Sequence, residues 1–563
     1  MGKVASLVWG CFLLLGMGGY GAEQGTTIEL NGRVSSTPWQ RDEQGQLFIQ
    51  DHWVRRVLGA TFLSSDQTQQ QRYQWYGSPA FAKALFVQPS RLLEINSFKQ
   101  GWRTESNGNT LRIFTPDTQI TEIRRNSTPK GERVTIALSR PTPWRQSQIA
   151  NQLSVTVAAE GTPTQLEKLT QPTDRISSLK LRPEGKELTL DLQFDAKLIP
   201  RVSTLSNPPR VVIDLEEGYL PTPTRIKWQP GITWREEWLQ LNGKSFQFYA
   251  LEINPKEQGL SFKPLWHNQA MTGNAPLPTI ASAAQATAAI NGGFFNRDRQ
   301  LPVGPLKREG VWYAGAVFKR GVVAWNDRNE FTFDRLDYRE TITIDANEPI
   351  KLTNLNSGYV QKGIARYLPS WGEYTNLTDS ETIVAVKNNQ ISQKTVTGPS
   401  LSQKFPIPAD GYLLVGRQVP ELLNLLPIQG RVKGEVVTRP PVLNQLPHLL
   451  GAGPLLLKEG KTVTDAIEEG FSKTFSNQTA TRSAIAKLKN GNLLLITIYP
   501  NPTLEQAAKI LQQLGAVDAL NLDGGGSSGL WLGGAMLDRQ GETRSIHNAL
   551  GVFTTTNSAK DSF

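Results

Sequence analysis

Ala519-Leu-Asn-Leu-Asp-Gly-Gly-Gly-Ser-Ser528 is the stretch that predicts most about the fold of this chain. It begins as an apolar run, typical of a buried strand, and then changes to a carboxylate, three glycines and two hydroxyl side chains. We therefore expect a strand over 517–522 and a tight loop from Asp523 onward. Glycine allows such a loop to present backbone N–H groups to an anion. The alternative is a plain turn that Asp523 caps. No Gly-Lys-Ser/Thr follows, so the loop is not a nucleotide P-loop.

The segment before this stretch predicts a helix. Thr503 is a suitable N-cap, and Gln506, three residues later, completes a capping box. Gly515 ends the helical pattern. The apolar residues on one helical face are Leu504, Ala507, Ala508, Leu511 and Leu514. A helix followed by a buried strand indicates an α+β catalytic domain with a mixed sheet and few helices, preceded by mostly-β modules.

Two further motifs place polar residues at the ends of apolar strands. In Ala288-Ala-Ile-Asn-Gly-Gly-Phe-Phe295, Asn291 lies at the predicted strand end, and the two aromatic residues either pack a sugar ring or fill the core. In Thr481-Arg-Ser-Ala-Ile-Ala486, Arg482 lies just before a buried strand. An arginine in that place commonly pairs with a carboxylate, and it is also a natural bidentate clamp for phosphate.

Taken in order, six motifs resemble those of the phosphodiester glycosidase family, which includes an enzyme that removes N-acetylglucosamine from a phosphodiester. The motifs are Asn291-Gly-Gly-Phe-Phe295, Pro302-Val-Gly304, Gly451-Ala-Gly-Pro-Leu455, Thr481-Arg-Ser-Ala484, Asn521-Leu-Asp-Gly-Gly-Gly-Ser-Ser528 and Asn548-Ala-Leu-Gly-Val552. Two positions depart from the family pattern. Ser483 stands where threonine is more usual, and His547 stands where small or apolar residues are common. Both departures affect the expected choice of substrate.

The resemblance implies hydrolysis between the anomeric carbon of an N-acetylglucosamine-like sugar and a phosphodiester. The departing phosphomonoester is a good leaving group, so a second carboxylate is needed less than in an ordinary glycosidase. Asp523 would activate water or stabilise the sugar cation, Arg482 would hold phosphate, and Asn291 would orient substrate or water. Residues expected to contact substrate or phosphate are Gly292, Gly293, Gly304, Asn521, Gly524, Gly525, Gly526, Ser527 and Asn548.

Several alternatives stay open at the level of sequence. The nucleophile and the stereochemical outcome are unassigned, with Asp298 and Glu309 as second-rank carboxylates. No cofactor is required, although a divalent cation at Asp523 is an option; the metal ligands are unknown. The same domain could bind glycans without catalysis, or it could be a plain phosphodiesterase that cuts the P–O bond.

The N-terminus reads as a secretory signal over residues 1–22. Lys3 precedes an apolar run from Val4 to Met17, and small residues follow. The run is too short to span a membrane, and no transmembrane segment is expected after its removal. Cys11, the single cysteine, lies inside it, so a mature chain has no disulfide. We expect an exported protein that is periplasmic, associated with the cell wall, or secreted.

The region between the signal and the catalytic domain predicts two kinds of β module. Residues 25–115 resemble the N-terminal module of copper amine oxidases, and 116–217 contain two similar β units that resemble wall-binding AMIN domains. A linker over 216–227 leads to the glycosidase domain over 228–556. The net charge of +10 comes from dispersed basic residues. It suits either solubility or attraction to an anionic wall polymer, rather than nucleic acid.

Overall fold

The computed structural model describes residues 23–99, 101–161, 169–267, 271–316, 318–345, 347–358, 360–539 and 543–555. Strands predominate and helices are few, which confirms a β-rich α+β fold. The predicted signal over 1–22 lies outside the described residues. Within the described ranges, no helix is long and apolar enough to cross a membrane.

An N-terminal module forms one curled sheet around helix α1 (Asp51–Arg56). The strand order is β4-β5-β6-β7-β3-β2-β1-β9-β8. The strands are β1 (Glu23–Leu30), β2 (Arg33–Arg41), β3 (Leu47–Gln50), β4 (Thr61–Phe62), β5 (Gln70–Gln74), β6 (Ala80–Val87), β7 (Ser90–Glu94), β8 (Arg103–Asn107) and β9 (Thr110–Phe114). Helix α1 follows β3 directly and carries two basic residues in its last turn.

A β-sandwich follows, and its two sheets mix the two sequence units. One sheet has the order β10-β11-β17-β16 and the other β12-β13-β15-β14. The strands are β10 (Ile120–Thr128), β11 (Gly131–Leu138), β12 (Trp144–Ile149), β13 (Gln152–Val157), β14 (Ile176–Glu184), β15 (Glu187–Phe194), β16 (Leu198–Leu205) and β17 (Arg210–Glu217). Each sheet takes one hairpin from each unit, so the repeat folds as one interlocked body with one core.

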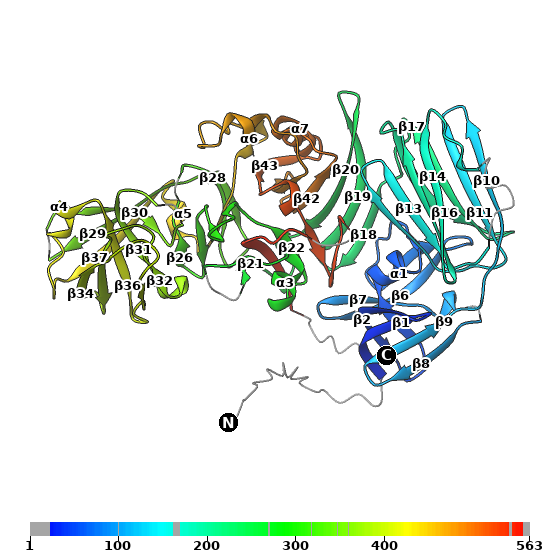
Figure 1. Cartoon of the computed structure of the whole chain (residues 1–563), viewed down its shortest axis with the longest axis horizontal. Helices are drawn as coiled ribbons and strands as arrows, with labels where there is room; N and C mark the ends of the chain where they lie inside the picture. Colours follow the sequence, from blue (N-terminus) through cyan, green and yellow to red (C-terminus); the bar gives the residue numbers. More distant parts are fainter. Residues whose placement is uncertain are drawn as a thin grey trace.

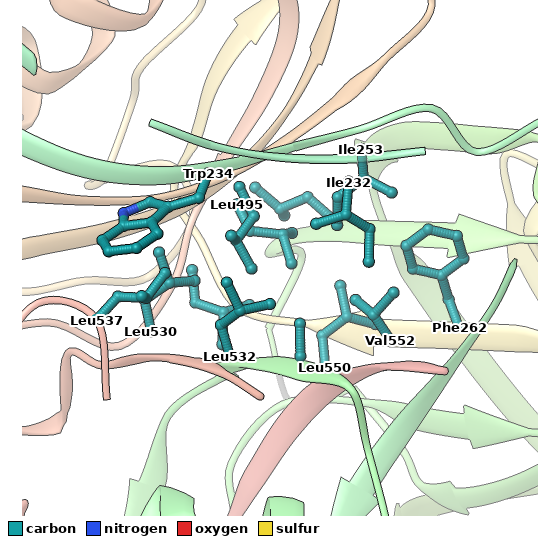
Figure 2. Packing of buried hydrophobic residues seen from close by; sticks show 14 of the residues in the cluster. Ile232, Trp234, Ile253, Phe262, Leu495, Leu530, Leu532, Leu537, Leu550 and Val552 are labelled. Carbon is teal, nitrogen blue, oxygen red and sulfur yellow. The ribbon is translucent and has the colours of Figure 1, made fainter. Parts of the chain in front are cut away.

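Two sheets face each other in the core of the C-terminal domain, with the orders β18-β19-β20-β42-β41-β43-β39-β40 and β21-β46-β22-β44-β45. Figure 2 shows Trp234, Leu495, Leu530 and Leu550 packed between them. The strands of the first sheet are β18 (Thr224–Gln229), β19 (Ile232–Leu241), β20 (Lys244–Ile253), β39 (Leu455–Lys458), β40 (Lys461–Thr462), β41 (Arg482–Leu488), β42 (Leu493–Tyr499) and β43 (Ala516–Asn521). Those of the second are β21 (Leu260–Trp266), β22 (Ala288–Asn291), β44 (Leu530–Leu532), β45 (Ala535–Met536) and β46 (Asn548–Thr554). Because β18 begins at Thr224, the segment between the sandwich and the core is shorter than the predicted linker.

The predicted helix and strand before the glycine loop are both present. Helix α7 (Leu504–Gln513) has the expected capping box: the Gln506 amide donates to Thr503 Oγ1 at 3.1 Å, and the Thr503 amide donates to Gln506 Oε1 at 2.9 Å. The apolar face of α7 packs on the outer face of the first sheet. Strand β43 then leads into the loop.

An inserted β domain interrupts the C-terminal domain and was not predicted (Figure 1, yellow-green). Its sheet order is β34-β33-β36-β31-β30-β29-β37, and it has its own apolar core. The strands are β29 (Asp337–Ile344), β30 (Ile350–Leu355), β31 (Gly363–Tyr367), β33 (Thr382–Lys387), β34 (Gln390–Val396), β36 (Gly411–Arg417) and β37 (Val432–Arg439). A sheet β26-β25-β38-β27-β28 joins it to the core. Those strands are β25 (Leu306–Arg308), β26 (Val311–Ala314), β27 (Gly321–Trp325), β28 (Phe331–Arg335) and β38 (His448–Gly451).

Short elements complete the described chain. The helices are α3 (Leu277–Ala283), α4 (Pro420–Leu423), α5 (Val442–Gln445) and α6 (Lys473–Asn477). The paired strands are β23 (Phe295–Asn296) with β24 (Leu301–Pro302), and β32 (Tyr374–Thr375) with β35 (Lys404–Phe405). Helix α6 and the β23–β24 hairpin matter most here, because each adjoins a motif that the sequence singled out.

Candidate functional site

The glycine loop leaves the end of β43 and is tied to its neighbours through the main chain. The amide of Leu522 donates to the Ser483 carbonyl at 2.9 Å, and the amide of Asp523 donates to the Gly292 carbonyl at 3.0 Å. A short 3₁₀ turn, η4, then covers Gly525–Ser527. The structure thus brings together the three motifs around Asn291, Arg482 and Asp523.

Asn291, at the end of β22, forms hydrogen bonds with both ends of the glycine loop. Its Nδ2 donates to the Asp523 carbonyl at 2.6 Å, and its Oδ1 accepts from the Gly529 amide at 3.0 Å. The side chain is completely buried. A buried carboxamide whose two ends are both bonded fixes local geometry, because breaking either bond leaves a desolvated polar group. Asn291 therefore supports the loop directly.

Asn548 and two glycines hold the neighbouring loop in the same way. Asn548 Oδ1 accepts from the Gly293 amide at 2.8 Å, and its carbonyl accepts from the Gly292 amide at 2.8 Å. A Cβ on Gly292 would collide with Asn548 Oδ1, and one on Gly293 would collide with the Gly451 carbonyl. These glycines are needed for close approach of the backbones.

Gly304 and Asn521 also lie against main chain. A Cβ on Gly304 would be 2.8 Å from the Gly451 carbonyl. Asn521 Nδ2 donates to the carbonyls of Gly453 and Leu522, each at 2.8 Å. Their predicted role in substrate contact stays a prediction, while their contacts in the structure organise the loops around Asp523.

Asp523 is a partly buried carboxyl with positive charges nearby. Burial raises its pKa above the ordinary value of 3.8, and the hydroxyl of Ser527, the amide of Gly524 and the charges of Arg297 and Arg544 partly offset that rise. The Gly524 amide donates to Asp523 Oδ1 at 3.0 Å. A carboxylate of raised pKa is a better base, as activation of water requires.

Arg482 is buried beside the same loop without a carboxylate partner. Its Nε donates to the Pro502 carbonyl at 3.2 Å and its Nη2 to the Gln478 carbonyl, and only 2% of the residue is exposed. Among the described residues, no Asp or Glu lies within ion-pair distance of it. Burial lowers its pKa to about 10, so it remains a cation at neutral pH.

The Arg482 guanidinium lies beside Gly524, the residue that follows Asp523. A Cβ placed on Gly524 would lie 3.9 Å from Arg482 Nη1, an ordinary van der Waals distance. The carboxylate partner that a buried arginine often has is missing here. A buried guanidinium with an unused Nη1 favours the other interpretation, an anion site.

The backbone amides of the loop are less available than the sequence suggests. Gly524 N–H is bonded to the side chain of Asp523, and Gly525 N–H donates to the Thr481 carbonyl at 2.8 Å. To bind phosphate as predicted, these two amides would have to exchange those partners. Arg482 is therefore the stronger candidate for the anion contact.

An aromatic cluster of Phe294, Phe471 and Phe475 lies beside Arg482. Of these three rings, only that of Phe294 was considered from the sequence. Phe471 and Phe475 stack at 4.6 Å between ring centroids, and Phe294 packs edge-on against them at 5.2 and 5.6 Å. Arg320 lies 4.0 Å over Phe471 and Arg482 lies 5.7 Å over Phe475. The i, i+4 spacing of Phe471 and Phe475 just before Arg482 was the available signal.

The second-rank carboxylates lie at the surface. Glu309 is exposed and pairs with Lys263 at 2.8 Å. Asp298, also exposed, lines a cavity of about 400 Å³ beneath the β23–β24 hairpin, together with Asn296, Arg299 and Gly358. Neither carboxylate contacts Asp523 in the described part of the chain.

The residues described around Asp523 include few side chains of the types that usually bind a metal. In the ranges that the structure describes, no three His, Cys, Asp or Glu side chains are grouped so as to hold a metal. The amide oxygens of Asn291 and Asn548 already accept hydrogen bonds, and the charges nearest Asp523 are arginines. His547 is buried with Nε2 2.8 Å from the Met271 carbonyl, and burial lowers its pKa to about 4.

The segment that carries the glycine loop matches a known enzyme family. Residues 380–553 match the family model of the phosphodiester glycosidases. The crystal structure of a hypothetical protein from Synechocystis is similar over nearly the whole chain, with 36% identity, a TM-score of 0.86, and coverage of 95% of this chain and 99% of that one. This chain belongs to the family of that Synechocystis protein. In this chain, the segment that matches the phosphodiester glycosidase model includes Arg482, Asp523 and Asn548, whereas Asn291 lies before that segment.

Two other solved structures are more distant. A Burkholderia pseudomallei protein is 16% identical, with a TM-score of 0.47 over 81% of this chain and 100% of that one. The catalytic domain of zebrafish N-acetylglucosamine-1-phosphodiester alpha-N-acetylglucosaminidase, described as auto-inhibited by its pro-peptide, is 14% identical, with a TM-score of 0.31 over 60% of this chain and 88% of that one. These two similarities are too low to carry a structural conclusion. No match was found among curated proteins.

Proposed function

We propose that this protein is an exported glycosidase that hydrolyses the bond between an anomeric carbon, in an N-acetylglucosamine-like sugar, and a phosphodiester of an envelope or extracellular glycan. The observation that carries the proposal is the position of the buried Arg482 guanidinium beside Gly524, the residue that follows Asp523. Among the described residues, no carboxylate pairs with the buried Arg482, and Asp523 is a partly buried carboxyl of raised pKa. The phosphodiester glycosidase match over 380–553 supports the same reading.

Arg482 supplies the anion contact in this mechanism. A phosphodiester carries one negative charge, and its phosphomonoester product carries more, so a fixed guanidinium favours the departing group over the bound substrate. Its carbonyl partners at Pro502 and Gln478 hold the arginine in place before the ligand arrives. Pre-organisation of this kind avoids reorientation during the reaction.

Asp523 supplies the base. It takes a proton from a water molecule, the water oxygen bonds to the anomeric carbon, and the bond from that carbon to the phosphate oxygen breaks. The phosphomonoester leaves with the electron pair of that bond, and the sugar gains a hydroxyl group. The stereochemical outcome depends on whether water attacks directly or after a covalent intermediate.

The surface around the site suits an anionic polymer. Arg297 and Arg544 are exposed and act electrostatically on Asp523, and the Arg544 guanidinium lies over Gly526. Neither forms an ion pair with a carboxylate in the described ranges. Exposed positive charge at the mouth of a site increases the rate at which an anionic ligand arrives.

The test is release of N-acetylglucosamine from a synthetic N-acetylglucosamine-1-phosphodiester by the mature protein. We expect turnover that Asp523→Asn and Arg482→Ala each reduce by about a hundredfold or more. Glu505→Gln, at an exposed carboxylate of the same domain that pairs with Lys509, is the matched control and should keep full activity. Label from ¹⁸O-water should enter the sugar; label in the phosphate would instead establish a P–O-cleaving phosphodiesterase.

A non-catalytic glycan-binding role gives a different result. In that case the wild type would release no sugar from a panel of sugar phosphodiesters, with or without added divalent cations. The folded Asp523→Asn protein would still bind the ligand as tightly as the wild type. That outcome would overturn the enzymatic proposal.

A further inference from the structure

The hairpin that follows the glycine loop is inserted into the N-terminal module. Strands β44 and β45 turn at Gly533 and Gly534, and Gln50 Nε2 donates to the Gly533 carbonyl at 2.5 Å. A Cβ on Gly534 would collide with Gln50 of the module, whereas one on Gly533 would lie 2.6 Å from the ring of Trp228, in β18 of the same domain. Gly534 therefore allows the hairpin to approach the module closely.

The module and the catalytic domain also share one apolar core. Trp53 and Leu58 of the module belong to the same buried cluster as Leu530, Leu532 and Leu537. At its centre, the fully buried Asp51 accepts from Trp228 Nε1 at 2.8 Å. An independent anchor would have a core of its own and a wet, polar interface. The N-terminal module is instead packed as part of the catalytic body.

Helix α1 reaches the segment just after the hairpin. Arg56, its last residue, donates through Nη2 to the carbonyls of Met536 and Leu537, the latter at 3.4 Å. Burial lowers the pKa of Arg56 to about 10, so it stays charged. Hydrogen bonds from a charged donor are stronger than neutral ones. Arg56 thus fixes the main chain immediately before Asp538.

The next two residues connect that segment to the glycine loop. Asp538 Oδ1 accepts from the Leu530 amide at 3.2 Å, and its Oδ2 accepts from Tyr499 at 2.9 Å. Arg539 donates through Nη2 to the Ser528 carbonyl and through Nη1 to the Gly526 carbonyl at 3.5 Å. The loop that carries Asp523 is therefore held from its C-terminal side by the segment that Arg56 fixes.

We propose that helix α1 positions the glycine loop, with Arg56 and Arg539 as positioning residues. The N-terminal module then sets the geometry of the site, in addition to any role in wall attachment. The positioning of the loop by α1 does not depend on the proposed function. The expected consequence for catalysis rests on the proposed function. Neither arginine needs to touch the substrate.

Hydrogen–deuterium exchange of the full-length protein tests the positioning directly. We expect Arg56→Ala to speed exchange of the amides between Gly524 and Leu530 by about tenfold or more, since a hydrogen bond from a charged group contributes on that order to a local opening equilibrium. The matched control is Arg55→Ala. Arg55 lies on the same helix but pairs with Glu236 and stacks 4.8 Å over Trp234.

Further variants keep the proposal testable whatever the activity. If Arg56→Ala fails to fold, Arg56→Lys and Arg539→Lys should show the same local change with a preserved melting transition. If the wild type is active, kcat of these variants should fall while KM stays nearly constant. The substitutions alter the position of the loop and leave the affinity for the ligand unchanged. Equal exchange in wild type, Arg56→Ala and Arg539→Lys would overturn the proposal. The test of positioning is the exchange measurement, and it does not depend on turnover. It applies equally if the wild type proves inactive.

Discussion

The carboxamide of Asn291 bridges the two ends of the glycine loop, donating to the carbonyl of Asp523 at 2.6 Å and accepting from the amide of Gly529 at 3.0 Å. With both polar ends bonded to main chain, Asn291 acts on Asp523 through the backbone. Its predicted part in orienting substrate or water would require one of these bonds to open. The Asp523 carboxyl, in consequence, is placed by a network of main-chain contacts.

Asn291→Asp should therefore be more harmful than Asn291→Ala. The carboxylate cannot donate to the Asp523 carbonyl, and it brings a buried charge beside another carboxyl. We expect a loss of about 3 kcal/mol or more in unfolding free energy for Asp and about 1–3 kcal/mol for Ala. Denaturant titrations measure both, with Asn296→Ala on the partly exposed β23 as the control. A stable Asn291→Asp protein would contradict the bridging role.

Asp523→Asn should stabilise the fold at neutral pH while it abolishes turnover. Burial raises the pKa of Asp523 in the folded state, so the native protein holds its proton more tightly than the unfolded chain. Stability from this group is consequently present below the ordinary pKa of 3.8 and is lost as pH rises through the folded-state pKa. The difference in unfolding free energy between Asp523→Asn and the wild type should therefore decrease as the pH falls toward 3.8. Denaturation curves of both proteins at neutral pH and at pH 3.8 measure this difference.

Inorganic phosphate should stabilise the wild type through Arg482. Because no carboxylate in the described ranges pairs with the buried guanidinium, a bound anion would supply its counter-charge. Millimolar phosphate should raise the Tm of the wild type and leave that of Arg482→Ala unchanged. Arg320→Ala is the matched control, since Arg320 stacks on the same aromatic cluster and should retain the response. An equal shift in all three proteins would indicate a nonspecific salt effect.

The loop glycines should differ in how they tolerate alanine. Gly293→Ala should be strongly destabilising, because its Cβ would collide with the rigid Gly451 backbone. Gly525 has φ +62 and nothing within 4 Å of a Cβ. Gly525→Ala should therefore cost only the left-handed backbone strain, about 1–2 kcal/mol. Thermal melts of the two variants measure the difference, and Gly293→Ala should have the lower Tm. Equal decreases in Tm would contradict the assignment of Gly293 to close backbone approach and of Gly525 to backbone conformation.

Local signals explain what could be predicted from the sequence. Helix α7 and strand β43 were expected because the Thr503–Gln506 capping box and the apolar run into Asp523 act within a few residues. The inserted domain over 337–439 was not expected, since its strands have the same alternating pattern as those of the core. Nothing local in that pattern says which sheet a strand joins.

The site shows the same division. The sequence by itself determined the residue types at Asn291, Arg482 and Asp523 and the glycines that let loops approach. Only the tertiary structure decided that no carboxylate of the described residues pairs with Arg482, and that Arg56 reaches the main chain at Met536. Partners so far apart along the chain are selected by burial and by the pairing of buried polar groups. Those terms act between surfaces that exist only once the chain has folded.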